Sequence, residues 1–330
     1  MGLRALFTFF SIAFSSFPNI AQNITDSVDV NQPKYKRIYP NVITARVFFI
    51  NTSNTLKVKD RSSNLSFNLE PNKQDRIGVS IAFRGLNASF SFAPDFLGEN
   101  KDNENSKLFN LNFRTFLGKH FMQTFDLFSQ KGFYIKNNEV NQYFPKTKNF
   151  KIGGATSYIF NEHFSFKAIT SQDEKQLKST GSFIPNITYF YSKFNLKNNS
   201  PLNEVNSSYY SFDIAFAPSY YYNYVPSKNL LLSAGVSAGI GLNHSKSRDE
   251  SPLTTLLTEL SFRTSATYDM NNLYCGLHYS YLSLNHNADS ASQVIDNIPF
   301  FNIFVGYRFK APKQIINTAE SINEKLKLKN

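Results

Sequence analysis

The sequence predicts an all-β fold: an antiparallel transmembrane β-barrel of about 12–14 strands, followed by a short C-terminal amphipathic helix. Three observations lead to it. Apolar and polar residues alternate with a period of two through most of residues 41–310, as they do in strands whose two faces meet different environments. Many alternating segments are about 9–13 residues long, which suits tilted membrane strands. The chain contains 34 Phe and 18 Tyr, and aromatic residues favour strands and membrane interfaces.

The alternation is clear in single segments. In residues 256–264, Leu260 and Phe262 occupy one face, whereas Ser261 and Arg263 occupy the other. Tight joints are expected at Gly85, 118–119, 161–162 and 271–272, and long polar loops at 94–106, 195–207, 242–254 and 285–297. Short turns at one end and long loops at the other are typical of outer-membrane barrels.

The first 21 residues have the features of an export signal. Arg4 precedes a short apolar run, Ala5 to Phe14, and a polar stretch that ends in Ala21. The run is too short to span a bilayer as a helix, so we expect a signal peptide at 1–21 that is cleaved after Ala21. The predicted organisation continues with an N-terminal periplasmic segment at 22–40 and an outer-membrane barrel at 41–310.

The last residues, 311–330, follow the barrel as a tail. Ile315, Ala319, Ile322 and Leu326 recur at intervals of four, three and four residues, which predicts an amphipathic helix over 313–328 on the periplasmic side. A loose polar tail is the alternative.

The formal charge of +11 is compatible with several partners. Abundant Lys beside Asn, Ile, Phe and Tyr indicates a composition bias that accounts for most of it. An anionic surface such as lipopolysaccharide also suits a basic protein, and the export signal argues against nucleic acid. We therefore expect outer-membrane lipid and lipopolysaccharide as surroundings, the barrel assembly machinery as a partner, and the cell outer membrane as the location.

Charged residues on the polar faces of the strands are expected to share the lumen. By the phase of the alternation they are Arg46, Arg84, Arg114, Asp126, Lys167, Asp213, Glu259, Arg263 and Arg308. Buried charges must be paired or wetted, so we interpret the set as a structural network in which Asp126 and Asp213 serve as partners for the arginines. Because basic residues outnumber acids, the alternative is an anion-preferring pore or pocket.

No catalytic, cofactor-binding or metal-binding residues are predicted. The 5 histidines lack metal-ligand spacing, and His278 alone is expected to face the lumen. His278 with Ser280 and Ser261 is the nearest approach to a hydrolase site, but serine is common on this whole face. The polar segment 172–180 is expected to be a solvated turn, and Cys275 is the single cysteine, so no internal disulfide can form.

Three stretches of the chain resemble the DUF4421 family, a barrel family of unknown function from Bacteroidetes. They are FDLFSQKGFYI at 125–135, FSFKAITSQDEKQLKSTGSF at 164–183, and Tyr39-Pro40-Asn41 before the first strand. Together they span most of residues 35–310. The resemblance implies an outer-membrane barrel and carries no activity and no catalytic residues.

The sequence therefore favours a non-enzymatic outer-membrane barrel, either structural or a passive pore with a basic polar lumen. Two alternatives stay open: a barrel enzyme that hydrolyses lipid or an envelope polymer, and a secreted soluble ligand-binding barrel.

Overall fold

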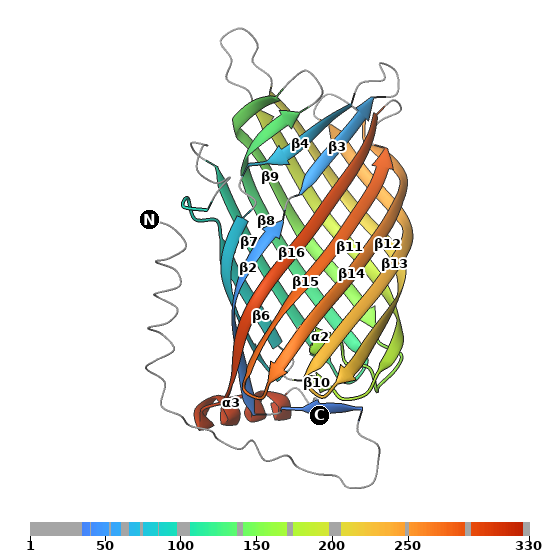
Figure 1. Ribbon diagram of the computed structural model, residues 1–330. Helices are drawn as coiled ribbons and strands as arrows, with labels where there is room; N and C mark the ends of the chain where they lie inside the picture. The colour runs from blue at the N-terminus through green and yellow to red at the C-terminus, as the bar shows by residue number, and fades with distance from the viewer. Residues whose placement is uncertain are drawn as a thin grey trace. The chain divides into compact units, whose positions relative to one another are not determined.

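The computed structural model describes residues 35–39, 41–52, 54–60, 66–72, 75–84, 86–97, 106–136, 141–169, 174–197, 206–247, 251–287 and 292–325. The predicted signal peptide at 1–21 lies outside them. Within the described residues the chain forms a closed antiparallel β-barrel (Figure 1). The all-β prediction is confirmed, and the barrel has 12 strands.

The wall is a nearly sequential meander. Its strands are β2 (Val42–Thr52), β5 (Asp75–Phe83), β6 (Leu86–Phe92), β7 (Lys107–Leu117), β8 (Phe121–Lys136), β9 (Asn141–Tyr158), β11 (Thr180–Lys197), β12 (Asn206–Ser227), β13 (Leu230–Ser247), β14 (Leu253–Met270), β15 (Leu273–Asn287) and β16 (Ser292–Lys310). Each pairs with its neighbour in an antiparallel register, and β16 closes the ring by pairing with β2, Phe304 opposite Phe48.

At the end of the barrel opposite α3, which we call the long-loop end, a hairpin replaces some of the strands of the wall (Figure 1). The end that carries α3 is the short-turn end. β3 (Thr55–Asp60) and β4 (Ser66–Pro71) pair with each other, with the first residues of β16, and with the last residues of β8. At that end two strands therefore replace β2, β5, β6 and β7. Because barrel diameter grows with strand number, the lumen narrows there.

The predicted alternation of faces is confirmed. Small and polar side chains such as Ser233, Ser237 and Ser265 point inward and are buried. Large apolar side chains on the same strands point outward; Leu260 is 60% exposed and Val236 is 59% exposed. The pleat places successive residues on opposite sides of the wall, so one strand serves two environments.

The joint between β9 and β11 is not the tight turn that the sequence predicts at 161–162. The chain instead folds back at the barrel end as a short helix, α2 (Phe166–Ile169), and a short strand, β10 (Glu174–Gln176). β10 pairs with β1 (Lys36–Ile38) in a separate small sheet. We call residues 159–169 and 174–179 the plug. Figure 1 shows α2 and β10 at the same end of the barrel as α3 (Lys313–Lys325).

The C-terminal helix is confirmed as α3, which begins directly after β16. Ala311 donates its backbone N–H to the carbonyl of Asn41, 2.8 Å away, and this bond joins the end of the barrel to its beginning. No helix in the described part of the chain is both long enough and apolar enough to span a bilayer.

Candidate functional site

A cavity of about 330 Å³ lies in the lumen. Its lining combines charged side chains with aromatic ones such as Phe166, Tyr221 and Phe300. The charged lining residues come from β2, β7, β8 and β14 and are Arg46, Arg114, Asp126, Glu259 and Arg263. Five of the nine predicted lumen charges thus surround one space.

Two arginines of the cavity flank one aromatic ring. The guanidinium carbons of Arg114 and Arg263 lie 5.5 and 5.6 Å from the centre of the Phe166 ring. Among the described residues neither guanidinium lies within ion-pair distance of a carboxylate, although both interact electrostatically with Asp126, and the Nε of Arg114 is buried without a hydrogen bond. Arg46 differs, because its Nε donates to the Ser80 hydroxyl at 2.8 Å. The ring of Phe166 is therefore a shared cation–π partner of the two arginines.

The expected direct pairing of Asp126 and Asp213 with arginines is not formed; Asp126 interacts with Arg114 and Arg263 only at longer range. The Asp126 carboxylate accepts a hydrogen bond from the Asn112 amide, and Asp213 accepts one from Asn243. In both cases the amide lies on the adjacent strand, directly opposite the acid. A neighbouring amide can reach the carboxylate without a long side chain crossing the lumen, and this proximity decides the pairing.

The three remaining predicted lumen charges, Arg84, Lys167 and Arg308, lie at the short-turn end. Their contacts there differ from the network that the sequence predicts. Arg308 is buried and pairs with Asp269, 2.8 Å away. Arg84 follows β5 in a turn, where it donates to Asn41 and contacts Glu320 of α3 at 3.1 Å. Lys167 was expected on the polar face of a strand.

Lys167 belongs instead to α2, and its Nζ lies 3.1 Å from Glu174. The described part of the segment 172–180, from Glu174 onward, is likewise not the expected solvated turn, because Glu174 and Gln176 are both buried. The polar composition of this segment reflects internal hydrogen bonds rather than solvent exposure.

Gln176 is the centre of the plug. Its amide nitrogen donates to the carbonyls of Tyr35 and His163, at 3.0 and 2.9 Å, and its amide oxygen accepts from the Ser165 N–H. Asn223, fully buried on β12, reaches both Gln176 and the Ser165 carbonyl. These bonds connect the plug to the wall and to the segment that leads into β1.

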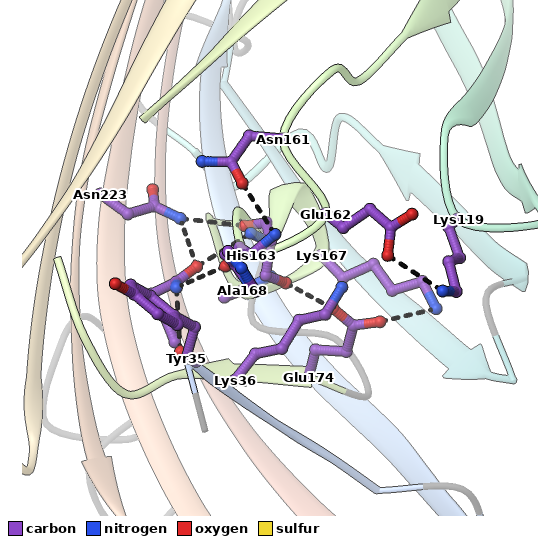
Figure 2. Close-up of polar contacts among 12 residues, drawn as sticks. Tyr35, Lys36, Lys119, Asn161, Glu162, His163, Lys167, Ala168, Glu174 and Asn223 are labelled. Atoms are coloured by element: carbon purple, nitrogen blue, oxygen red, sulfur yellow. Dashed lines mark hydrogen bonds and ion pairs between the residues drawn. The ribbon is translucent and has the colours of Figure 1, made fainter. Parts of the chain in front are cut away.

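Figure 2 shows a second group of contacts in the plug, around Glu174. Its carboxylate accepts from the Ser165 hydroxyl at 2.7 Å and faces Lys167 and Lys36. Burial alone would raise the pKa of Glu174, but the two lysines and the Ser165 hydroxyl outweigh burial and hold the pKa below its ordinary value of 4.5. Glu174 is therefore a structural carboxylate that is ionised at neutral pH.

Apolar packing completes the plug. Phe164, Phe166 and Ile169 form one buried cluster with Met122, Ile159, Ile184 and Tyr221 of the adjoining wall and strand ends. The Ser165 hydroxyl also accepts the Ala168 N–H, at 3.0 Å, and so caps the first turn of α2. Side chains therefore fill this end of the lumen.

An ion pair that sequence reasoning missed crosses the other half of the lumen. Lys151 of β9 pairs with Asp296 of β16, and both side chains are buried. These strands are not neighbours, because β3, β4 and β8 separate them on one side and β11 to β15 on the other. Lys151 lies in a stretch with several lysines, and its phase alone did not distinguish it from solvated ones.

Farther toward the long loops an apolar cluster occupies the interior. Leu69, Phe133 and Phe194 form its buried centre, with Leu56, Val58, Phe67, Ile135, Leu196 and Tyr209 packed around it. His286 donates to or accepts from the Tyr209 hydroxyl at 3.0 Å and is buried. His278 is thus not alone in the interior, contrary to the sequence-based expectation.

The residues of the considered hydrolase site do not form a dyad. His278 lines the cavity, and its ring packs against Phe300 at 5.5 Å. Its Nε2 is buried and has no hydrogen-bond partner among the described residues, so neither Ser280 nor Ser261 is bound to it. The described residues also contain no cluster of three or more His, Cys, Asp or Glu that could hold a metal.

The fold and its interior define a class: a closed antiparallel β-barrel with an internal plug. A model of the family described as "Domain of unknown function (DUF4421)" matches residues 25–309. The chain belongs to this family, as the three resembling stretches implied. No curated protein matches the chain.

Solved structures with similar folds include two outer-membrane proteins. The outer membrane protease OmpT from Escherichia coli is 8% identical, with a TM-score of 0.41 over 83% of this chain and 98% of that one. The COG4313 outer membrane channel from Pseudomonas putida F1 is 9% identical, with a TM-score of 0.39 over 85% and 100%. At TM-scores below 0.5 neither likeness carries an argument about function.

Proposed function

We propose that this protein is an integral outer-membrane β-barrel with a closed lumen, which acts by binding or by structural support and is neither an open pore nor an enzyme. The observation that carries the proposal is the combination of an apolar outer face with an interior that side chains block at more than one level. A water-soluble barrel has a polar outer face, whereas here many large apolar side chains are exposed on the outer face.

The outer face supports membrane insertion. Near the short-turn end the rings of Phe121, Tyr158, Phe160 and Phe183 contact one another in succession, edge to face or tilted, with ring centres 5.0–5.7 Å apart. Exposed Tyr224, Tyr268 and Tyr307 continue the aromatic residues on other strands near the same end. Girdles of aromatic residues at the interface, beside a taller apolar band, are typical of outer-membrane barrels.

The interior supports the closed lumen. The plug fills the short-turn end, the Lys151–Asp296 pair crosses the lumen, and the apolar cluster around Phe133 fills the narrowed long-loop end. Passage of an ion would require a charged pair and two packed clusters to separate, and each carries a cost in free energy. Of the two non-enzymatic roles that the sequence suggests, a structural barrel and a passive pore, the interior therefore favours the structural barrel.

The test combines localisation with electrical recording on the full-length protein. Membranes from expressing cells are washed with carbonate and the protein is followed by heat-modifiable gel mobility. The purified barrel is then inserted into planar bilayers. We expect retention in outer membranes, a heat-dependent shift and no steady conductance. Recovery from the soluble periplasm would contradict the membrane assignment, and a stable open current would contradict the closed lumen.

A further inference from the structure

We propose that the central cavity is a binding site for a small organic oxyanion, a carboxylate or phosphate attached to a compact apolar body, held by Arg114 and Arg263. The inference deepens the proposed function, because it rests on the barrel having a closed, ligand-holding interior. The juxtaposition that points to it is two arginines that lie beyond ion-pair distance of any described carboxylate and face one aromatic-lined space.

The lining of the cavity has more basic than acidic side chains. Arg46, Arg114 and Arg263 line it, against Asp126 and Glu259. Asp126 accepts a hydrogen bond from Asn112 and interacts electrostatically with both Arg114 and Arg263, but no carboxylate in the described part of the chain lies within ion-pair distance of either guanidinium, and the basic groups of the lining outnumber the acids. Interior charges without ion-pair partners are unfavourable, so we expect water or an anion to contact these two guanidinium groups.

The geometry of the donors selects the kind of anion. Arginine presents its N–H groups in a fixed planar fork that matches carboxylate and phosphate oxygens. Both guanidinium groups lie within 6 Å of the centre of the Phe166 ring and belong to the lining of the same cavity. The buried Nε2 of His278, unpartnered among the described residues, lines the same cavity and supplies one more polar atom.

The apolar part of the lining selects the body of the ligand. Phe166, Tyr221, Leu282, Ile298 and Phe300 surround the space between the charged groups. Small-molecule sites usually combine such a lining with a few placed polar groups, in cavities of about 300–1,000 Å³. The volume of about 330 Å³ therefore fits a molecule the size of one ring or a short chain, and excludes a polymer or a whole lipid.

The test measures binding to the full-length barrel in detergent micelles by calorimetry. The probes are benzoate and phenyl phosphate, with benzamide as the neutral match for benzoate and inorganic phosphate as the anion without an apolar body. We expect one or both organic anions to bind at least tenfold more tightly than benzamide and than inorganic phosphate. The stronger of the two identifies the carboxylate or phosphate source.

Variants locate the site. Arg114→Gln combined with Arg263→Gln should weaken binding of the preferred anion at least tenfold, whereas Lys119→Gln removes an exposed charge at the short-turn end and should leave it unchanged. If the double variant does not fold, Arg263→Lys replaces it in the test, because lysine keeps the positive charge but lacks the planar pair of N–H donors of arginine. It should retain the preference over benzamide with weaker binding.

Gel mobility of each sample separates the two proposals. A sample without the heat-dependent shift contradicts the barrel assignment itself. A shifted, folded barrel that binds benzamide as tightly as benzoate, binds no probe, or keeps full affinity in the arginine variants overturns the anion site and leaves the barrel assignment standing.

Discussion

At the residue scale, the two faces of one strand lie in different environments and favour different side chains. Leu260 lies near the middle of β14 and points outward, whereas Ser261 lines the cavity. Leu260→Lys would place a charge in the bilayer and should destabilise the folded barrel by about 2–4 kcal/mol. Ser261→Lys should cost less, because it adds a charge to a polar interior beside Glu259.

Urea unfolding in lipid vesicles, followed by gel mobility, measures both variants. Equal losses would mean that the two positions do not differ in environment, which would contradict the outward placement of Leu260 in a membrane.

The Lys151–Asp296 pair provides a second prediction for single residues. Lys151→Met leaves the Asp296 carboxylate buried without its cation, and breaking a buried pair typically costs about 3–5 kcal/mol. Lys151→Met with Asp296→Leu removes both charges and should recover most of the loss. A double variant as unstable as the single one would show that packing, rather than the charge, dominates at this position.

At the element scale, the plug depends on an ionised carboxylate. The pKa of Glu174 is lowered in the folded protein, so its contribution to stability is present above its ordinary pKa and is lost as the pH falls through the folded value. Glu174→Gln should therefore reduce stability at pH 7, and the difference from wild type should shrink toward acidic pH.

The control is Glu162→Gln, at an exposed pair with Lys119 that solvent screens. Unfolding midpoints from pH 7 to pH 3 would show the difference; a gap between wild type and Glu174→Gln that stays constant with pH would contradict the assigned role.

The change in the wall between β7 and β4 depends on Gly132. Its φ is +87°, and an added Cβ would lie 2.4 Å from the Ser106 and Tyr143 hydroxyl oxygens. Its carbonyl accepts the Asn72 N–H, at 3.2 Å, where β4 leaves the wall. Gly132→Ala should cost about 1–3 kcal/mol from left-handed strain and the clash.

Gly118→Ala is the matched control, since its φ is +62° with nothing within 4 Å. It should show the strain alone, so the two variants losing equal stability in urea would argue that the contacts at Gly132 are unimportant.

At the scale of the whole molecule, the proposed closed lumen rests on three sets of interior contacts: the plug, the Lys151–Asp296 pair and the apolar cluster around Phe133. β9 and β11 already pair as neighbours, with Ser157 opposite Asn186, so a short turn can replace residues 162–178 without breaking the wall. We expect this variant to remain closed in planar bilayers, because the Lys151–Asp296 pair and the apolar cluster are still present. Combining it with Lys151→Ala and Asp296→Ala should raise the leak current. Steady conductance from removal of the plug alone would show that the plug is the only barrier.

The three stretches that carry the family resemblance lie where the barrel is irregular. FDLFSQKGFYI contains Gly132 at the change in the wall, and 164–183 contains most of the plug and the start of β11. Tyr39 and Asn41 contact Arg308 and Ala311 at the barrel's first and last strands. Regular strands tolerate many sequences on each face, whereas a bend, a plug or a closure requires particular residues.

Strands, faces, the turns at 118–119 and 271–272 and the terminal helix could be predicted from the sequence because they depend on patterns of a few residues. Leu260 outward and Ser261 inward follow from the pleat alone. Partners across the lumen could not be predicted, since Lys151 and Asp296 are 145 residues apart and meet only because the sheet closes. The sequence did not reveal the plug for the same reason. The segment 172–180 has the polar composition of a solvated loop, and only the tertiary structure brings Ser165, Asn223 and Tyr35 into hydrogen-bonding distance of Gln176. Local alternation therefore specifies the wall, and ring closure decides which interior charges are paired and which two arginines are left facing a cavity.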